Sequence, residues 1–203
     1  MSEFILFSKL LQPKYRQFDR VLMRFVFGLA SALARPLDSV AADLFLNGET
    51  MEIEKKLKSL GFDLPNTPVP AANYIGSVRV GNLLFVGGNI GRINGALKYR
   101  GKVGGAVTLE QAYEAARNCA LNHLALIKAA LGDLDRVERI VKVLGYVNVA
   151  PGFTEMPKVV NGESDLLVQL WGEQGQHTRA AVGVAALSQD SPVETEVTVQ
   201  VKE

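Results

Sequence analysis

The C-terminal stretch that decides the fold reads His177-Thr178-Arg179-Ala180-Ala181-Val182-Gly183-Val184-Ala185-Ala186-Leu187, then Ser188-Gln189-Asp190-Ser191-Pro192, then Val193-Glu194-Thr195-Glu196-Val197-Thr198-Val199-Gln200-Val201. The first and last runs are typical of strands, and the Ser, Asp and Pro between them are typical of a turn. The pattern therefore predicts a hairpin or a crossed-strand unit. Arg179 and Glu194 stand at the starts of the two runs. A strand that buries one face rarely places a charge near its core unless that charge has a partner or a task. Both residues are therefore candidates for a functional site.

The middle of the chain adds a long helix and a further strand. Thr108-Leu109-Glu110-Gln111 is a capping box, with Thr108 as N-cap, and the apolar spacing predicts a helix to Leu131 that Gly132 ends. The run 137–149 is rich in β-forming residues and predicts a strand.

A second helical stretch begins near Phe153 and runs to about Trp171. Pro157 is tolerated only near a helix start, and Asn161-Gly162 can break or kink a helix, so the pattern allows one kinked helix or two short ones.

The N-terminal side of this region predicts a short helix and two hairpins. Apolar residues at helical spacing predict a helix over 53–60, and 77–86 predicts two short strands joined at Gly81-Asn82. Asn94-Gly95 is a type I′ turn signal. The order strands, helix, strand, helix, strands predicts an α+β fold, with helices on one face of a mixed sheet.

Composition restricts the class of partner and the compartment. The 203 residues carry a net charge of +1, with 48% hydrophobic and 21% charged residues. This balance gives no electrostatic case for binding nucleic acid or an anionic membrane. The single cysteine, Cys119, excludes an internal disulfide and fits a reducing compartment such as the cytoplasm. Its position among alanines and leucines indicates a small core residue.

Residues 1–50 differ in composition from the rest of the chain. Up to Pro36 there are six basic residues against two acidic ones, and the apolar run 21–34 is interrupted by Arg24 and too short to span a bilayer. We expect a dispensable leader or a start-site artefact, with an organelle or export signal as the alternative. Residues 51–203 carry sixteen basic and sixteen acidic side chains and form the predicted domain.

From about Pro68 to Val201 the chain resembles the YjgF/RidA family of reactive-intermediate deaminases, some of which have been called endoribonucleases. The matching features are Val80-Gly81-Asn82-Leu83-Leu84-Phe85-Val86-Gly87-Gly88-Asn89-Ile90, the helix 108–131, Gly132-Asp133-Leu134-Asp135-Arg136-Val137 and the C-terminal unit. The lengthened region 153–176 departs from the deaminase archetype and resembles a less characterised branch.

The resemblance implies a chorismate-mutase-like α+β fold with two main helices on one face, assembled as a homotrimer with clefts between subunits. It also implies hydrolysis of 2-imino or enamine acids to 2-oxo acids and ammonia, without a cofactor or a metal. Arg179 matches the arginine that clamps the substrate carboxylate, Glu194 the acid that handles water and proton, and Tyr74 a tyrosine of the cleft. The other implied substrate-binding positions are Gly88, Asn89 and Ala181, the last in place of a frequent cysteine.

Two alternatives stay open. Arg179 and Glu194 can instead form an ion pair that holds two strands together. The chain can be a non-catalytic trimer that binds small carboxylates as a sensor or stabilises other proteins. The only histidines, His123 and His177, are not arranged with serine and aspartate as in a Ser/His/Asp hydrolase and do not have the spacing of metal ligands. His123 lies one residue off the apolar stripe of its helix, so we expect it at the boundary of the core.

Overall fold

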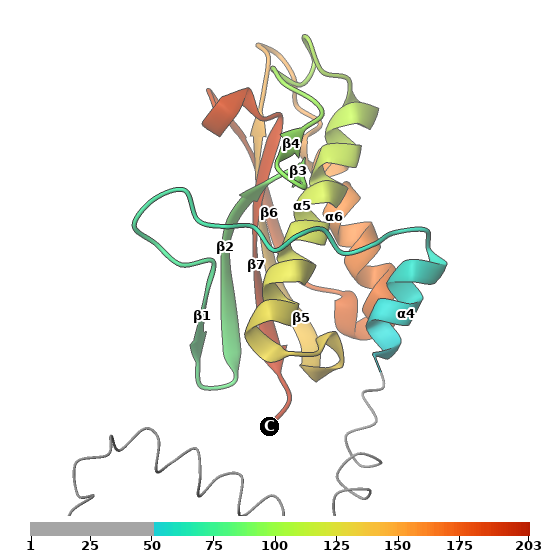
Figure 1. Ribbon diagram of the computed structural model, residues 1–203. Helices are drawn as coiled ribbons and strands as arrows, with labels where there is room; N and C mark the ends of the chain where they lie inside the picture. The colour runs from blue at the N-terminus through green and yellow to red at the C-terminus, as the bar shows by residue number, and fades with distance from the viewer. Residues whose placement is uncertain (1–50) are drawn as a thin grey trace, which may run out of the picture. The chain divides into compact units, whose positions relative to one another are not determined.

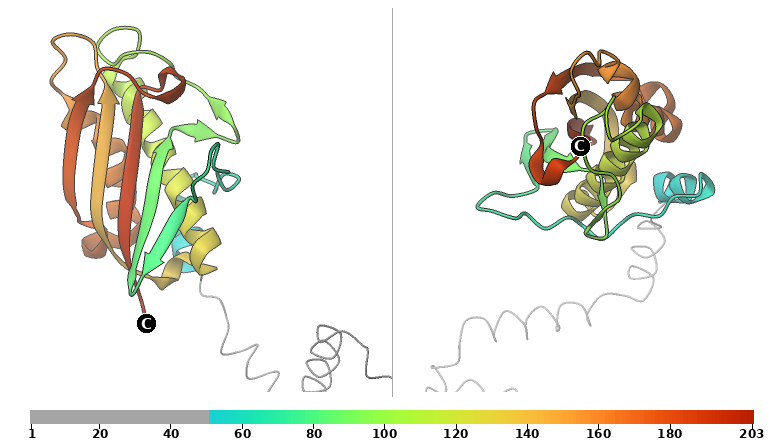
Figure 2. Two further views of the ribbon diagram at one scale, coloured as in Figure 1. Left: turned by 90° about the vertical axis from the view of Figure 1, so that its left-hand side faces the viewer. Right: turned by 90° about the horizontal axis from the view of Figure 1, so that it is seen from above.

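The computed structural model describes residues 51–203, which form a five-stranded mixed sheet with helices on one face (Figures 1 and 2). This confirms the predicted α+β class. The leader predicted for residues 1–50 lies outside the described residues. The helices and strands are α4 (Glu52–Ser59), β1 (Ser77–Val80), β2 (Leu83–Ile90), β3 (Arg92–Ile93), β4 (Ala96–Leu97), α5 (Leu109–Leu131), β5 (Val137–Asn148), α6 (Met156–Trp171), β6 (Thr178–Val184) and β7 (Val193–Val201). Short 3-10 turns are η2 (Leu134–Arg136), η3 (Gly172–Gly175) and η4 (Ser188–Asp190).

The sheet order is β1-β2-β7-β5-β6, with β5 and β6 parallel and the other neighbours antiparallel. The C-terminal unit is therefore not a hairpin, because β5 lies between β6 and β7. β7 alternates valines with polar residues and has a partner strand on both edges, whereas β6 occupies the edge of the sheet. Only the crossed-strand reading of this unit is correct.

The two faces of the sheet differ in what covers them. The odd-numbered residues of β7, from Val193 to Val201, are buried on the helix side, so Glu194 and Glu196 face the side without helices. The helix-free face also carries apolar side chains of β1, β2 and β6 that are more than 40% exposed. They are Val78, Val80, Phe85 and Val182. An antiparallel sheet can leave one face to water, but that face is then usually polar.

Helix α5 begins as predicted. Thr108 Oγ1 accepts a hydrogen bond from the Gln111 backbone N–H at 3.2 Å, and the Gln111 side chain accepts one from the Thr108 N–H at 3.0 Å. Gly132 follows its last turn with a positive φ of 85°. Both predicted ends are confirmed.

We expect Thr108→Ala to lower the free energy of unfolding by about 1 kcal/mol, because it leaves a helix N–H without its acceptor. Thr108→Ser keeps the hydroxyl and is the matched control. Urea denaturation of the three proteins measures the difference. Equal stability of the Ala variant and the wild type would contradict a stabilising role for the cap.

Helix α6 is continuous, which settles the choice between one helix and two. Pro157 lies in its first turn, and Gly162 does not break it. A Cβ on Gly162 would lie 2.0 Å from the Tyr113 carbonyl oxygen of α5, so glycine is needed where the two helices touch.

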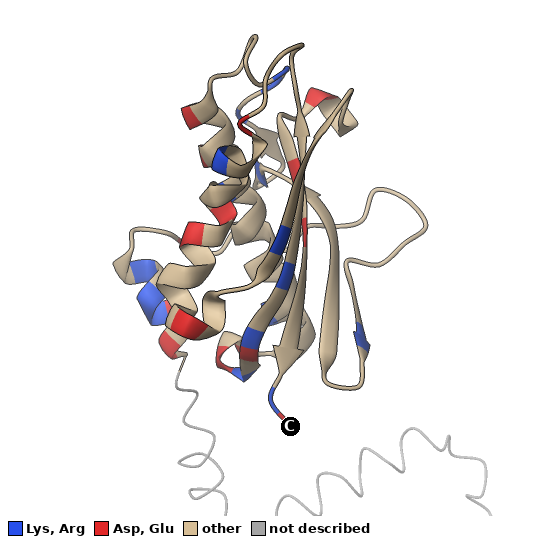
Figure 3. Cartoon of the chain, turned by 180° about the vertical axis from the view of Figure 1, so that it is seen from behind, with Lys and Arg blue, Asp and Glu red and all other residues tan. Residues whose placement is uncertain are grey.

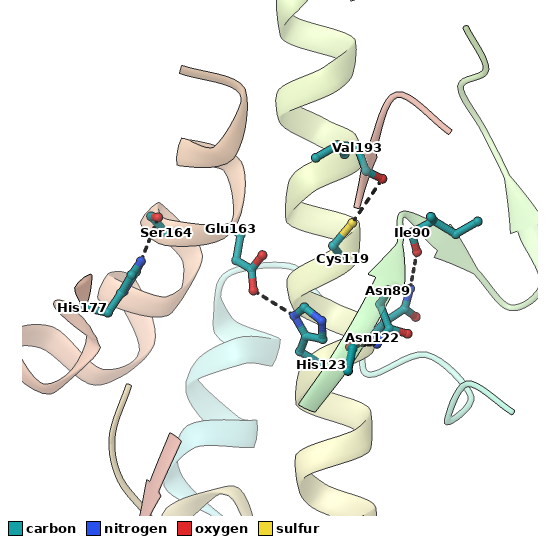
Figure 4. A network of polar contacts seen from close by, with 10 residues as sticks. Asn89, Ile90, Cys119, Asn122, His123, Glu163, Ser164, His177 and Val193 are labelled. Atoms are coloured by element: carbon teal, nitrogen blue, oxygen red, sulfur yellow. Dashed lines mark hydrogen bonds and ion pairs between the residues drawn. The ribbon is translucent and has the colours of Figure 1, made fainter. Parts of the chain in front are cut away.

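The same packing explains an error in the prediction for His123. Its ring is fully buried and Nδ1 lies 2.8 Å from Glu163 Oε1 of α6, with both side chains 0% exposed (Figure 4). The boundary position was wrong because α6 covers that side of α5. Cys119, one turn earlier on α5, is confirmed as a core residue.

Acidic residues beside α4 have a structural use. Glu54, Asp133 and Asp135 have carboxylate oxygens within 4.8 Å of one another. Asp135 accepts hydrogen bonds from the first backbone N–H groups of α4 at 2.8 and 2.9 Å, and Glu54 lies 3.1 Å from Lys128 Nζ. The cluster therefore fixes α4 to the domain. Within residues 51–203, no helix is both long and apolar enough to cross a bilayer.

Candidate functional site

A cleft of about 450 Å³ opens beside the bulged end of β2. Its walls are the segment 66–71, the β3–β4 hairpin, two residues of α5, residues 188–189 and the start of β7. Four of the site residues implied by the family resemblance line it. They are Tyr74, Gly88, Asn89 and Glu194.

Glu194 is the carboxyl group of this cleft. Burial raises its pKa above the ordinary value of 4.5, repulsion from Glu196 raises it further, and His123 opposes the shift. A raised pKa brings a carboxyl closer to the range in which general acids and bases work. Glu194 is therefore the candidate acid and base of this cleft.

The bulge of β2 makes room for this carboxylate. The register of β2 against β7 shifts between Val86 and Asn89, so Gly87 and Gly88 form the irregular step. A Cβ on Gly88 would lie 2.3 Å from Glu194 Oε1. Any side chain at position 88 would displace the carboxylate, so glycine is required for close approach.

The two asparagines of the cleft fix its walls. Asn89 donates from Nδ2 to the Gly87 carbonyl at 2.9 Å and so holds the bulge itself. Asn122 of α5 donates to the carbonyls of Ile90 at 3.0 Å and Arg92 at 2.7 Å (Figure 4). The end of β2 and the start of β3 are thereby tied to the long helix.

Arg92 and Asn122 are cleft residues that sequence reasoning missed. Arg92 lines the cleft, and its guanidinium has no hydrogen-bond or ion-pair partner among residues 51–203. The only signal was a basic residue directly after the glycine-rich end of β2. No periodicity distinguishes such an arginine from a solvent-exposed one.

The structure places Arg179 elsewhere in the single chain. Its Nη1 donates to Asn161 Oδ1 at 2.8 Å and Ser164 Oγ at 2.9 Å, and Nη2 donates to the Pro157 carbonyl at 3.3 Å. All three acceptors belong to α6. The alternative of an ion pair between Arg179 and Glu194 is therefore wrong.

Sheet register explains the separation. Arg179 is aligned with Val143 of β5, whereas Glu194 is aligned with Tyr146. The offset of three residues and two strand spacings puts the two Cα atoms roughly 14 Å apart, and the odd offset sends their side chains to opposite faces. Ala181, aligned with Gly145, lies on the same face as Arg179 and packs against the core.

The single chain thus combines a half-buried carboxyl with a polar cleft, and it carries Arg179 away from this cleft on β6. The Tyr74 side chain is 57% exposed and lies at the cleft, and it has no hydrogen-bond partner among residues 51–203. Such a cleft suits a small polar molecule. The charges of the domain are interspersed, with basic and acidic residues side by side on helices and sheet (Figure 3).

Comparison with known proteins gives one family and three informative relatives. The family model described as "YjgF/chorismate_mutase-like, putative endoribonuclease" matches residues 54–192. Protein TCP17 of Trypanosoma cruzi is 41% identical over 149 residues, covering 73% of this chain and 93% of its own. The crystal structure of Atu1372 from Agrobacterium tumefaciens, a protein of unknown function, has a TM-score of 0.72 and 40% identity, and covers 80% of this chain and 99% of its own. A "putative endoribonuclease" from Shewanella oneidensis has a TM-score of 0.71 and 31% identity, over 73% and 99% of the two chains.

Proposed function

Because the chain belongs to the YjgF/chorismate mutase-like family, we propose that it hydrolyses reactive 2-imino and enamine acids to 2-oxo acids and ammonia in the cleft around Glu194. The observation that carries the proposal is the position of this carboxyl, half-buried against Gly88, with a raised pKa. Protonation of the enamine form at carbon gives the protonated imine, so one site serves both substrates.

Glu194 moves one proton from water to the leaving nitrogen. Starting from the protonated imine, its carboxylate takes a proton from water as the oxygen attacks the C=N carbon, which gives a neutral tetrahedral amino alcohol. The resulting carboxylic acid returns this proton to nitrogen, the C–N bond breaks as the C=O bond forms, and the hydroxyl proton leaves with the nitrogen as ammonium. Such general acid–base catalysis contributes about 10²- to 10⁴-fold.

Arg179 is proposed to clamp the substrate carboxylate from a neighbouring subunit. Within one chain it lies too far from Glu194 to share a ligand, but it stands exposed on the edge strand β6. The exposed apolar residues of the helix-free face support an assembly that covers this face, because solvent-exposed apolar patches of this kind mark protein contacts. A homotrimer would complete the site at each subunit interface.

Two other functions need separate tests. The word endoribonuclease describes the matched family and the Shewanella protein. Equal numbers of acidic and basic residues in 51–203 favour a small substrate over RNA, whose binding depends on a positive surface. A non-catalytic carboxylate-binding trimer would keep Arg179 and show no turnover.

The test generates 2-iminobutanoate with a threonine dehydratase in the presence of semicarbazide, which traps the imine. Wild-type protein is expected to suppress semicarbazone formation and speed the release of 2-oxobutanoate. Arg179→Ala is expected to raise KM about 100-fold, because it removes a bidentate charged contact, while the assembly remains intact in light scattering.

Arg179→Lys is the matched variant. It keeps the charge but not the planar pair of donors, so it should recover only part of the affinity. Saturable binding of 2-oxobutanoate by a wild type that leaves semicarbazone formation unchanged would favour the non-catalytic alternative. Loss of the assembly in Arg179→Ala would show that this arginine is structural.

A further inference from the structure

The arginine on β6 is the end of a chain of hydrogen bonds. Ser164 of α6 lies between two nitrogen groups: Arg179 Nη1 at 2.9 Å and His177 Nε2 at 3.0 Å. On its other side, the His177 ring places Nδ1 2.6 Å from the carbonyl oxygen of Gly175. Figure 4 shows the Ser164–His177 contact between α6 and the segment that leads into β6.

The direction of these hydrogen bonds follows from the Gly175 carbonyl at one end of the chain. A carbonyl oxygen only accepts, so His177 Nδ1 must carry a hydrogen and donate to Gly175. In the neutral ring, Nε2 is then a bare acceptor, and the Ser164 hydroxyl donates to it. This leaves the lone pairs of Ser164 for Arg179. Ser164 is therefore oriented as an acceptor for the guanidinium.

The acceptors of α6 occupy one part of the guanidinium and leave another part free. Of its five N–H groups, both on Nη1 and one on Nη2 face Asn161, Ser164 and Pro157. The other two, on Nε and Nη2, have no partner within the described part of the chain. Nε and Nη2 form one edge of the planar group, and two parallel donors on one edge match the two oxygens of a carboxylate.

The residues joined by these hydrogen bonds differ in burial, with the buried residues at one end and the exposed arginine at the other. Gly175 is buried, Ser164 and His177 are half-buried, and Arg179 is exposed. The fixed end is thus anchored in the domain and the charged end is accessible. A long arginine side chain otherwise samples many rotamers, and restricting it before binding reduces the entropy lost when the ligand arrives.

We infer that Ser164 and His177 are positioning residues, which hold the Arg179 guanidinium with its Nε–Nη2 edge outward to receive the carboxylate of the substrate. The inference rests on the proposed function. It assigns a role to the lengthened region 153–176 and to the histidine that follows it. Neither residue touches the substrate, and both act through Arg179.

The experiment measures turnover of 2-iminobutanoate and binding of 2-oxobutanoate for the wild type and for Ser164→Ala, Ser164→Thr, His177→Phe and Arg179→Ala. Ser164→Ala is expected to raise KM and the dissociation constant about tenfold, because the arginine loses one ordered acceptor. The value of kcat should stay within about twofold, since the lost interaction concerns binding of the carboxylate alone. Ser164→Thr keeps the hydroxyl and should restore wild-type KM, while His177→Phe should follow Ser164→Ala.

Ser59→Ala is the matched control. Ser59 also lies on a helix and its hydroxyl also bonds a neighbour, the Lys56 carbonyl at 2.7 Å, but it belongs to α4. Unchanged KM in Ser164→Ala, alongside weakened binding in Arg179→Ala, would overturn the positioning role and leave the proposed function standing. An equal fall of kcat and stability in Ser164→Ala and Ser164→Thr would also overturn it, in favour of a packing role. If the wild type neither turns over the imine nor binds the oxo acid, the proposed function fails and the inference with it.

Discussion

Replacing Glu194 with Gln is expected to lower kcat for 2-iminobutanoate by about 10²- to 10⁴-fold, with little change in KM. The amide has nearly the same shape as the carboxyl, but it cannot take a proton from water. Semicarbazide competition under saturating substrate measures the loss. Glu196→Gln, on the same face of β7, is the comparison: Glu196 is absent from the cleft lining, and its loss removes only the repulsion that helps raise the pKa of Glu194, so kcat should fall far less. A Glu194→Gln enzyme with wild-type kcat would assign the proton transfers to another group.

The same substitution should also change stability, in the opposite direction. Burial raises the pKa of Glu194 in the folded chain above 4.5. The folded state therefore favours the protonated form, and ionised Glu194 destabilises it at pH values above the folded pKa. The Gln variant should melt at a higher temperature than wild type at neutral pH, and this difference should vanish as the pH falls below about 4.5. A variant that melts lower at neutral pH would contradict the burial of this charge.

Replacing His123 alone with Leu is expected to lower the free energy of unfolding by about 3–5 kcal/mol. The substitution removes the hydrogen-bond partner of Glu163 and leaves its carboxyl in a core where it is 0% exposed. Glu163 Oε2 has no partner in the described structure, so nothing compensates for the loss. Denaturant unfolding followed by the fluorescence of Trp171 measures the change.

Two further variants test whether the loss of stability comes from breaking the His123–Glu163 pair or from the change in packing. Glu163→Leu leaves the imidazole of His123 without its acceptor and should cost less, about 1–3 kcal/mol. The double variant removes both polar groups and should recover most of the loss, since apolar replacements of buried pairs are often close to neutral. A double variant as unstable as His123→Leu would mean that leucine does not fit at this position.

Local sequence patterns predicted the elements but not how they meet. The capping box at Thr108 and the type I′ signal at Asn94-Gly95 depend on a few neighbouring residues, and both hold: Asn94 and Gly95 have positive φ angles of 50° and 84°. The place of β5 between β6 and β7 depends on pairing between distant strands. No periodicity contains that information, and so the hairpin alternative stayed open.

Site residues divide in the same way. The resemblance pointed to Glu194 and Gly88 as site residues, and the structure adds why the two positions depend on each other: the glycine leaves room for the carboxylate. The sequence did not predict Arg92 and Asn122 as cleft residues, and only the folded structure places them there. The partners of Arg179 in α6 were equally hidden, because sequence spacing does not reveal which turn of a helix faces a strand.

The buried position of Cys119 makes this chain a favourable background for chemical footprinting. It is the only cysteine of the 203 residues, it is 0% exposed, and burial followed by the nearby Glu163 raises the pKa of its thiol well above the usual value. Maleimides react with thiolates, so the native protein offers them no ready target. A single cysteine introduced at Val80, a position 62% exposed on the helix-free face, would then report alone. Its rate of modification at rising protein concentration would measure directly whether that face becomes covered.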